Sequence, residues 1–173
     1  AYIDFGGASA VELTRQYDNV LVIQTFSKSR SLAGLRIGYA LGHKNLIEGL
    51  ERVKNSFNSY PLDSLAIAGA VAALEDDEYF RETTGKIIDC REWTTNQLEA
   101  LGFDVVPSAT NFVFTCHRSL SGAELMSYLR SNNLLVRHFG KPGIENFLRI
   151  TIGTYDEMQE LINTLKQHPD ISS

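Results

Sequence analysis

The sequence is poor in the features that define several large classes of protein. It holds only two cysteines, Cys90 and Cys116, whose spacing fits neither a metal site nor a redox pair, so we expect two reduced thiols and no metal. No apolar run reaches the roughly 18 residues of a membrane span, and no signal-peptide pattern is visible. The net charge of −5 leaves no basic excess, which argues against a nucleic-acid partner. We therefore expect a cytoplasmic protein that contacts neither membranes nor nucleic acid.

The sequence also lacks an initiator methionine and any internal repeat. It opens with "AYIDFGG", in which residues 2–5 have the pattern of a strand. A terminus inside a strand frays unless neighbouring chain anchors it. The sequence therefore predicts a fragment of a longer protein. Its 173 residues suffice for one medium domain or two small ones.

The first 75 residues alternate between strand-like and helix-like patterns. The run "NVLVIQTF" is β-branched and apolar, as in a strand buried on both faces, and a second strand is expected near residues 37–40. We expect helices over residues 9–17, 43–55 and 59–74; the second has one apolar face and the third is apolar enough to be buried. This pattern predicts an α/β domain over residues 1–75.

From residue 76 onward the pattern is that of a small α+β domain. An acidic run over residues 75–80 begins a long helix that reaches about Ala100. Beyond it we expect helices over residues 121–133 and 155–167, and strands over residues 103–108, 111–116, 134–139 and 147–153. Strands covered by helices on one face form such a domain. The predicted second domain is therefore 76–173.

The segment "TFSKSRSLAGLRIGYA", residues 25–40, places Lys28 in a polar loop directly after a buried strand. A lone lysine in a loop is most often solvated. A phosphate loop of the type GxxxxGK[ST] is excluded, because here the glycines follow the lysine. A third interpretation is a lysine that forms a Schiff base with a carbonyl cofactor, which requires an amine beside a cofactor site. Hydroxyls of Thr25 and Ser27, with Arg36, are suited to hold the phosphate of such a cofactor.

This segment resembles the pyridoxal-phosphate lysine motif of fold-type I aminotransferases, S-K-x-x-x-L-A-G-L-R-x-G-Y, and is closest to the histidinol-phosphate aminotransferase branch. Five other stretches resemble the same branch in order: "AYIDF", "YPLDSLAIAGAVAAL", "PSATNFVF", "LLVRHF" and "FLRITIG". The resemblance covers essentially the whole chain. It implies the C-terminal part of the large cofactor-binding domain, with a mixed and mostly parallel sheet, followed by the small α+β domain.

The resemblance implies a role for five residues around the cofactor, pyridoxal 5'-phosphate. Lys28 is the Schiff-base lysine, and it also moves the proton between the substrate α-carbon and the C4′ atom of the cofactor. Tyr2 donates a hydrogen bond to the phenolic oxygen of the cofactor. Thr25, Ser27 and Arg36 hold its phosphate.

Three residues of the second domain correspond to positions near the substrate. Arg149 binds the substrate carboxylate or another anion at that place, and Arg137 assists with a substrate phosphate. Asn111 lies close to the substrate. From the residues alone, Arg137 can also be a surface arginine on an edge strand, and Asn111 can be a turn residue before a strand. For Arg149, between two apolar residues of a strand, the buried charge needs a partner, and an incoming anion supplies one.

The sequence departs from the family pattern at its start. The family's aspartate on the pyridine nitrogen, which keeps the ring an electron sink, lies upstream of Ala1, as do the stacking aromatic and part of the phosphate loop. We therefore expect the chain by itself to be inactive. For the parent protein the resemblance implies a homodimer that transfers an amino group from histidinol phosphate to 2-oxoglutarate in histidine biosynthesis. Aromatic amino-acid aminotransferase, threonine-phosphate decarboxylase and the ligand-sensing domain of a regulator stay open as alternatives.

Overall fold

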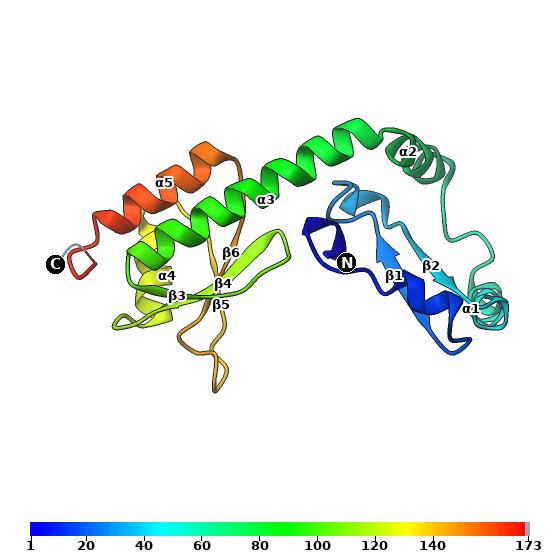
Figure 1. Ribbon diagram of the computed structural model, residues 1–173, viewed down its shortest axis with the longest axis horizontal. Helices are drawn as coiled ribbons and strands as arrows, with labels where there is room; N and C mark the ends of the chain where they lie inside the picture. Colours follow the sequence, from blue (N-terminus) through cyan, green and yellow to red (C-terminus); the bar gives the residue numbers. More distant parts are fainter. Residues whose placement is uncertain (172–173) are drawn as a thin grey trace. The chain divides into compact units, whose positions relative to one another are not determined.

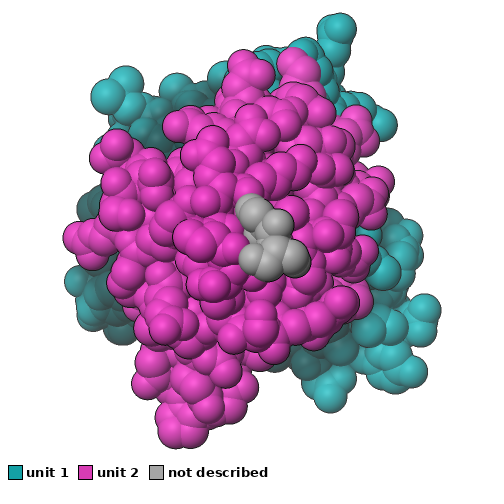
Figure 2. Space-filling model, turned by 90° about the vertical axis from the view of Figure 1, so that its left-hand side faces the viewer, with its two compact units in different colours: residues 1–84 teal, residues 85–173 magenta. Residues whose placement is uncertain are grey.

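The computed structural model describes residues 1–171. The chain groups into two compact units, one over Ala1–Thr84 and one from Gly85 onward (Figures 1 and 2). The division falls inside helix α3, Asp77–Ala100, whereas the boundary expected near residue 76 falls between α2 and α3. A domain division at residues 75 and 76 stays a prediction. No helix of the described residues is long and apolar enough to cross a membrane.

The first unit is built around an antiparallel strand pair. Strands β1 and β2 pair from Leu21 opposite Gly42 to Thr25 opposite Gly38. Three short 3-10 helices and two longer helices complete the unit with the start of α3. In chain order the elements are η1 (Ile3–Phe5), η2 (Val11–Arg15), β1 (Leu21–Thr25), η3 (Ala33–Leu35), β2 (Gly38–Gly42), α1 (Lys44–Phe57) and α2 (Ser64–Glu75).

Two expectations for the first unit are confirmed and one is wrong. The helix expected over residues 43–55 is α1, and the strand expected near 37–40 is β2. The strand expected over residues 2–5 is wrong, because Ile3–Phe5 form the 3-10 turn η1. That turn closes with a bond from the amide of Gly7 to the carbonyl of Ile3, and Gly6 follows it with a left-handed φ of 108°. Two glycines favour such a turn over an extended strand.

The burial expected for the first unit is wrong within the described residues. Strand β1 exists, but its Ile23 is 68% exposed, so the strand is not buried on both faces. Helix α2 exists as well, but of its residues only Ala66 is buried, and Leu65 is 80% exposed. Within the described residues β1 pairs with β2 alone, and the local core contains only Phe26, Ile37 and Ala66 with a few half-buried neighbours. Such a small core leaves most apolar side chains of the unit in contact with solvent.

The second unit is a four-stranded antiparallel sheet packed against helices, as expected. The strands are ordered β3-β4-β6-β5. The four predicted strands, the two predicted helices and the long helix are all present. After α3 the elements are β3 (Phe103–Val106), β4 (Phe112–His117), α4 (Gly122–Ser131), β5 (Arg137–His138), β6 (Leu148–Thr151) and α5 (Tyr155–Lys166). Figure 1 shows α3, α4 and α5 in green, yellow and orange.

The alternation of side chains along β4 and β6 gives this sheet two different faces. Val113 lies opposite Ile150, and both side chains are buried in the core with residues of α3, α4 and α5. Their neighbours Phe114 and Arg149 also lie opposite one another, and they point to the other face because successive side chains alternate. The second unit therefore keeps its helices on one face and carries an arginine on the other.

The α/β class is confirmed by the mixture of helices and sheets and by the comparisons given below. The sheet type expected for the first unit is not seen in the part of the chain that the structure describes. All strand pairs formed by residues 1–171 are antiparallel, whereas the resemblance implied a mostly parallel sheet. The two strands of the first unit follow one another in the chain, and they pair antiparallel with Leu21 opposite Gly42.

Candidate functional site

The loop between β1 and β2 is closed at its base by a small apolar core. The amide of Phe26 donates to the carbonyl of Ile37 at 3.1 Å, and the amide of Leu32 donates to the carbonyl of Phe26 at 3.0 Å. Phe26 and Ile37 are both buried. Because β1 and β2 run antiparallel, the end of β1 and the start of β2 lie at the same edge of the pair. The loop therefore brings Lys28 and Arg36 to one edge.

Two residues of this loop adopt a backbone conformation that side chains disfavour. Ser31 has a φ of 56° and Arg36 a φ of 54°, both in the left-handed region. The amide of Ser31 donates to the carbonyl of Lys28 at 3.0 Å, which closes a turn immediately after the lysine. Strained residues of this kind persist only where their surroundings hold them, and they cluster at binding sites.

Two hydroxyl groups lie together at the end of β1. The hydroxyls of Thr25 and Ser27 are 3.0 Å apart, and the amide of Ser27 donates to the Thr25 hydroxyl oxygen at 3.1 Å. The strands approach closely here, because a Cβ atom on Gly38 would lie 2.7 Å from the carbonyl oxygen of Gln24. Glycine at this position therefore allows the pairing that puts Thr25 beside the loop.

Lys28 and Arg36 contribute two positive charges at this edge. The Lys28 ammonium lies 5.6 Å from the centre of the Tyr2 ring, and the lysine side chain is exposed. The Arg36 guanidinium donates to the carbonyl oxygen of Ala33 at 2.7 Å and is also exposed. No carboxylate among residues 1–171 pairs with either cation. Two uncompensated cations beside two hydroxyls suit a phosphate.

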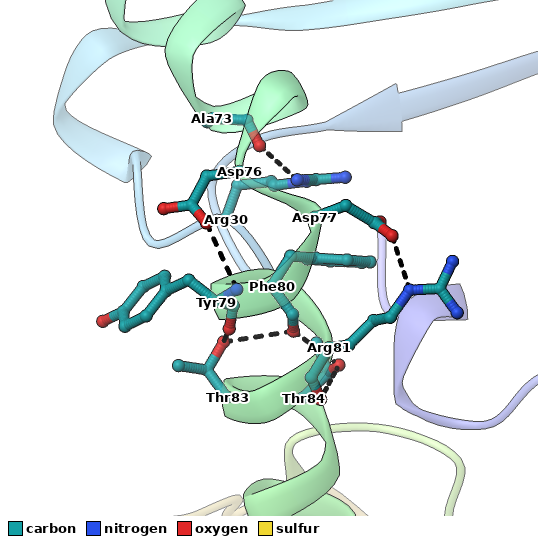
Figure 3. Close-up of polar contacts among 9 residues, drawn as sticks. All are labelled: Arg30, Ala73, Asp76, Asp77, Tyr79, Phe80, Arg81, Thr83 and Thr84. Atoms are coloured by element: carbon teal, nitrogen blue, oxygen red, sulfur yellow. Dashed lines mark hydrogen bonds and ion pairs between the residues drawn. The ribbon is translucent and has the colours of Figure 1, made fainter.

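The two residues after Lys28, Ser29 and Arg30, make long-range contacts within the first unit that the sequence analysis missed. The buried Ser29 donates its hydroxyl to the carboxylate of Asp4 at 2.5 Å. Arg30 places its guanidinium 3.6 Å above the ring of Phe80 and donates to the carbonyl oxygen of Ala73 (Figure 3). Neither contact has a local sequence signal, since the partners are 25 and 43 residues or more away in the chain.

The second unit carries a pair of arginines on the open face of its sheet. Arg137 on β5 and Arg149 on β6 are direct cross-strand partners. The Nε atom of Arg149 is buried and has no hydrogen-bond partner within the described residues. Aromatic rings flank both guanidinium groups, at 5.3 Å for Phe112 under Arg149 and 5.5 Å for Phe139 under Arg137. Like charges directly opposite one another repel, so this pair suits an anion that both arginines contact.

Asn111 stands at the start of β4, beside the same sheet. Its backbone carbonyl accepts from the amide of Ile152 at 2.9 Å, which extends the β4–β6 pairing by one bond. Within the first unit the structure therefore places the Tyr2 ring beside Lys28, the Thr25 and Ser27 hydroxyls beside each other, and Arg36 at the far end of the same loop. It brings Arg137 and Arg149 together, with Asn111 on the neighbouring strand, within the second.

The remaining titratable groups offer no second site of obvious chemistry. In the described part of the chain no three His, Cys, Asp or Glu side chains are grouped so that they could hold a metal ion. Both cysteines are free thiols. Burial raises the pKa of the Cys90 thiol, and a hydrogen bond with Thr94 offsets only part of this rise. Burial and the nearby charge of Asp104 both raise the pKa of the Cys116 thiol. Neither thiol is activated as a nucleophile.

Comparison with known proteins assigns the chain to a family. Residues 1–165 match the family model described as aminotransferase class I and II. The chain belongs to this family. The resemblance seen in the sequence is therefore confirmed, and so is its fold class.

The similar proteins point to one branch of the family. Histidinol-phosphate aminotransferase 1 of Bradyrhizobium diazoefficiens is 59% identical over 167 residues, which are 96% of this chain and 48% of the relative. The solved structure of histidinol-phosphate aminotransferase from Sinorhizobium meliloti, in complex with pyridoxal-5'-phosphate, superposes with a TM-score of 0.82. It is 28% identical, and the match covers 99% of this chain and 46% of that one.

A phosphate-handling decarboxylase is similar too. The L-threonine-O-3-phosphate decarboxylase of Porphyromonas gingivalis superposes with a TM-score of 0.76 at 27% identity, over 95% of this chain and 52% of that one. A similar fold therefore occurs in a protein that is named a decarboxylase. The chain spans about half the length of the curated relatives it matches.

Proposed function

We propose that the whole protein is a pyridoxal-phosphate-dependent aminotransferase that transfers the amino group of histidinol phosphate to 2-oxoglutarate. The observation that carries this proposal is the Lys28 loop, which begins and ends at the same edge of the β1–β2 pair. With the end of β1 it carries an exposed amine, two adjacent hydroxyls and an exposed guanidinium that has no carboxylate partner among the described residues. The 59% identity to a protein named histidinol-phosphate aminotransferase supports the choice of substrate.

The residues of the loop fit the cofactor. Pyridoxal phosphate supplies an aldehyde that condenses with amines and a ring that takes up the electrons of a broken α-carbon bond. Thr25, Ser27 and Arg36 offer hydroxyl and guanidinium donors to its phosphate. Lys28 has no carboxylate partner among the described residues, so its amine is available to the aldehyde.

The five residues of this site would then divide the work between them. Lys28 would hold the cofactor through its amine and, as a free amine, would move the proton at the substrate α-carbon. Tyr2, whose ring lies beside the Lys28 ammonium, directs its hydroxyl to the phenolic oxygen of the cofactor. Thr25, Ser27 and Arg36 fix the phosphate end.

In the second unit the arginine pair would bind the charged end of the substrate. Arg149 takes a carboxylate of glutamate or the phosphate of histidinol phosphate, and its unpartnered Nε supports this role. Arg137, directly opposite, adds a second guanidinium for the phosphate. Asn111 lies near the substrate at the start of β4. A homodimer in the cytoplasm, which uses small amino and 2-oxo compounds but neither membrane nor nucleic acid, completes the proposal.

A labelling experiment tests the assignment of the lysine. The full-length protein is incubated with pyridoxal phosphate, reduced with borohydride and digested, and the modified peptides are mapped. We expect the label on Lys28 alone. Label on Lys44 or Lys54 instead would refute the assignment. Lys28→Ala should abolish turnover and leave non-covalent cofactor binding, because the phosphate donors remain.

A substrate comparison tests the reaction. The full-length protein is offered histidinol phosphate, an aromatic amino acid and threonine phosphate in separate assays, with 2-oxoglutarate as amino acceptor. We expect turnover with histidinol phosphate and formation of glutamate. Release of carbon dioxide from threonine phosphate would instead favour the decarboxylase. Binding without turnover of any substrate would favour a ligand sensor.

A further inference from the structure

We propose that Arg30 and Asp4 are positioning residues for Lys28. They hold the two residues that follow the lysine, and so fix the direction of its amine at the cofactor site. This inference rests on the proposed role of Lys28 and adds two residues that neither the sequence motif nor the comparisons assign.

The first contact is the hydrogen bond between Ser29 and Asp4, which are 25 residues apart in the chain. Ser29 is 6% exposed, and its hydroxyl donates to the Asp4 carboxylate at 2.5 Å. Asp4 lies in η1, two residues after Tyr2, whose ring faces the Lys28 ammonium. Tyr2, directly before η1, therefore contacts the lysine side chain, and η1 itself contacts the residue directly after the lysine.

The second contact is made by Arg30, which connects the loop after β1 to helices α2 and α3 (Figure 3). Its guanidinium lies over the ring of Phe80 at 3.6 Å and donates to the carbonyl oxygen of Ala73, in the last turn of α2. The last carbonyls of a helix lack intrahelical partners and carry partial negative charge, so a cation is favoured there. A planar guanidinium serves the carbonyl and the ring together, which an ammonium cannot do equally well.

The start of α3, where Arg30 makes its ring contact, carries several further hydrogen bonds. The carboxylate of Asp76 accepts from the amide of Tyr79 at 3.2 Å and begins α3, where Phe80 sits in the first turn. Hydroxyls of Thr83 and Thr84 donate back to the carbonyl of Phe80, at 3.2 and 2.7 Å (Figure 3). These bonds hold the backbone of α3 at Phe80, the residue whose ring Arg30 contacts.

The contacts of Ser29 and Arg30 restrict the backbone conformation at Lys28. Its carbonyl accepts from Ser31, and the next two residues are pinned to η1 and to the junction of α2 and α3. The Lys28 ammonium has no hydrogen-bond or ion-pair partner within residues 1–171 and faces only the Tyr2 ring, so the direction of this long, flexible side chain depends mainly on its backbone. A misplacement of about 1 Å at a reacting group costs up to roughly 100-fold in rate. Loosening either contact should therefore lower the reactivity of the Lys28 amine.

The test uses the full-length protein and two readouts. The rate of borohydride-trapped labelling is measured at a large excess of pyridoxal phosphate, which also modifies exposed lysines slowly, at Lys28 and, in the same samples, at the exposed Lys44 as internal reference. The turnover number and KM are measured separately. For Arg30→Met and Asp4→Ala we expect the ratio of Lys28 to Lys44 labelling to fall about 10-fold or more, with turnover falling in parallel and KM nearly unchanged.

Conservative variants separate positioning from general support of the fold. Asp4→Asn keeps an acceptor oxygen for Ser29 and should retain most of the labelling ratio. Arg30→Lys keeps the cation but not the planar stack and should be intermediate. If Arg30→Met fails to fold, the labelling ratio and the turnover number are measured on Arg30→Lys and Phe80→Leu instead. Arg81→Ala is the matched control. Arg81 follows Phe80 directly in α3, but its exposed side chain pairs with the exposed Asp77 at 2.6 Å rather than with a residue of the loop.

The outcomes distinguish this inference from the proposed function. If the unaltered protein is labelled elsewhere than Lys28, the proposed function fails first. If it is labelled at Lys28 and the Arg30 and Asp4 variants keep the normal labelling ratio, the positioning role is overturned. A lower unfolding temperature with a normal labelling ratio would likewise overturn it, since this is what a purely structural contact produces.

Discussion

Arg137 and Arg149 lie directly opposite one another across β5 and β6, and no carboxylate in the described part of the chain pairs with either. Two like charges in direct cross-strand register destabilise a sheet. The Nε atom of Arg149 is also buried without a partner among the described residues, which costs further free energy. A bound anion would lower both unfavourable free energies, because it would neutralise the repulsion between the two arginines and accept a hydrogen bond from the Arg149 Nε atom.

Inorganic phosphate should therefore stabilise the second unit. At a phosphate concentration ten times the dissociation constant, the free energy of unfolding rises by about 1.4 kcal/mol. Arg149→Gln should abolish this gain, and Arg118→Gln, whose arginine already pairs with Asp104, should not. Thermal unfolding in phosphate and in chloride of equal ionic strength measures the difference. An equal gain for the Arg149 variant would show that the phosphate binds elsewhere.

Removal of the Arg36 guanidinium should weaken cofactor binding by the full-length protein. A hydrogen bond to a charged group is worth about 1.5–3 kcal/mol, and since Arg36 is exposed we expect about 2 kcal/mol for Arg36→Ala. That corresponds to roughly a 30-fold rise in the dissociation constant of pyridoxal phosphate. A titration followed by absorbance measures it, with Arg15→Ala on η2 as control. An unchanged constant would mean that Arg36 does not contact the phosphate.

A cavity in the second unit should destabilise that unit selectively. Leu129 of α4 is fully buried in the main core, so Leu129→Ala should cost about 3 kcal/mol in free energy of unfolding. Leu135→Ala, at a position 82% exposed, should cost almost nothing. Hydrogen exchange resolved by peptide measures both, and for Leu129→Ala it should rise over the second unit only. Equal protection in the two variants would contradict the assigned core.

The start of α4 should show a pH-dependent stability. Hydrogen bonds from the Ser121 hydroxyl and the Ser121 amide hold the pKa of Glu124 below its usual value. A lowered pKa means that this stabilisation is present at neutral pH and is lost as the pH falls through the folded-state value. Glu124→Gln keeps an acceptor but does not titrate, so its stability should depend less on acid. Urea unfolding between about pH 7 and pH 3 checks this, with Glu99→Gln as control.

The chain of 173 residues should self-associate when produced by itself. Phe57 of α1 and Leu65 of α2 are each 80% exposed, and Ile23 of β1 is 68% exposed. Large exposed apolar surface favours association in water. Phe57→Ser and Leu65→Lys should reduce the weight-average mass in sedimentation, while Glu51→Gln should not. A monomeric unaltered chain would contradict this expectation.

The second unit was predictable almost in full, because its patterns are local. Alternating apolar residues along β4 and β6, and the apolar faces of α4 and α5, bury one another within a short stretch of chain. The first unit was less predictable. Its strand and helix were recognised, but not the exposure of Ile23 and Leu65, since composition tells which residues favour burial and not what covers them.

The order of residues by itself determined the family and predicted the loop that bears Lys28, because the segment over residues 25–40 and five further stretches match the family pattern in order. Tertiary structure alone decided how that loop is held. Asp4 reaches Ser29, and Ala73 with Phe80 receives Arg30, across 25 residues or more of intervening chain. Tertiary structure also placed Arg137 opposite Arg149, since strand register depends on pairing between distant segments and not on either sequence alone.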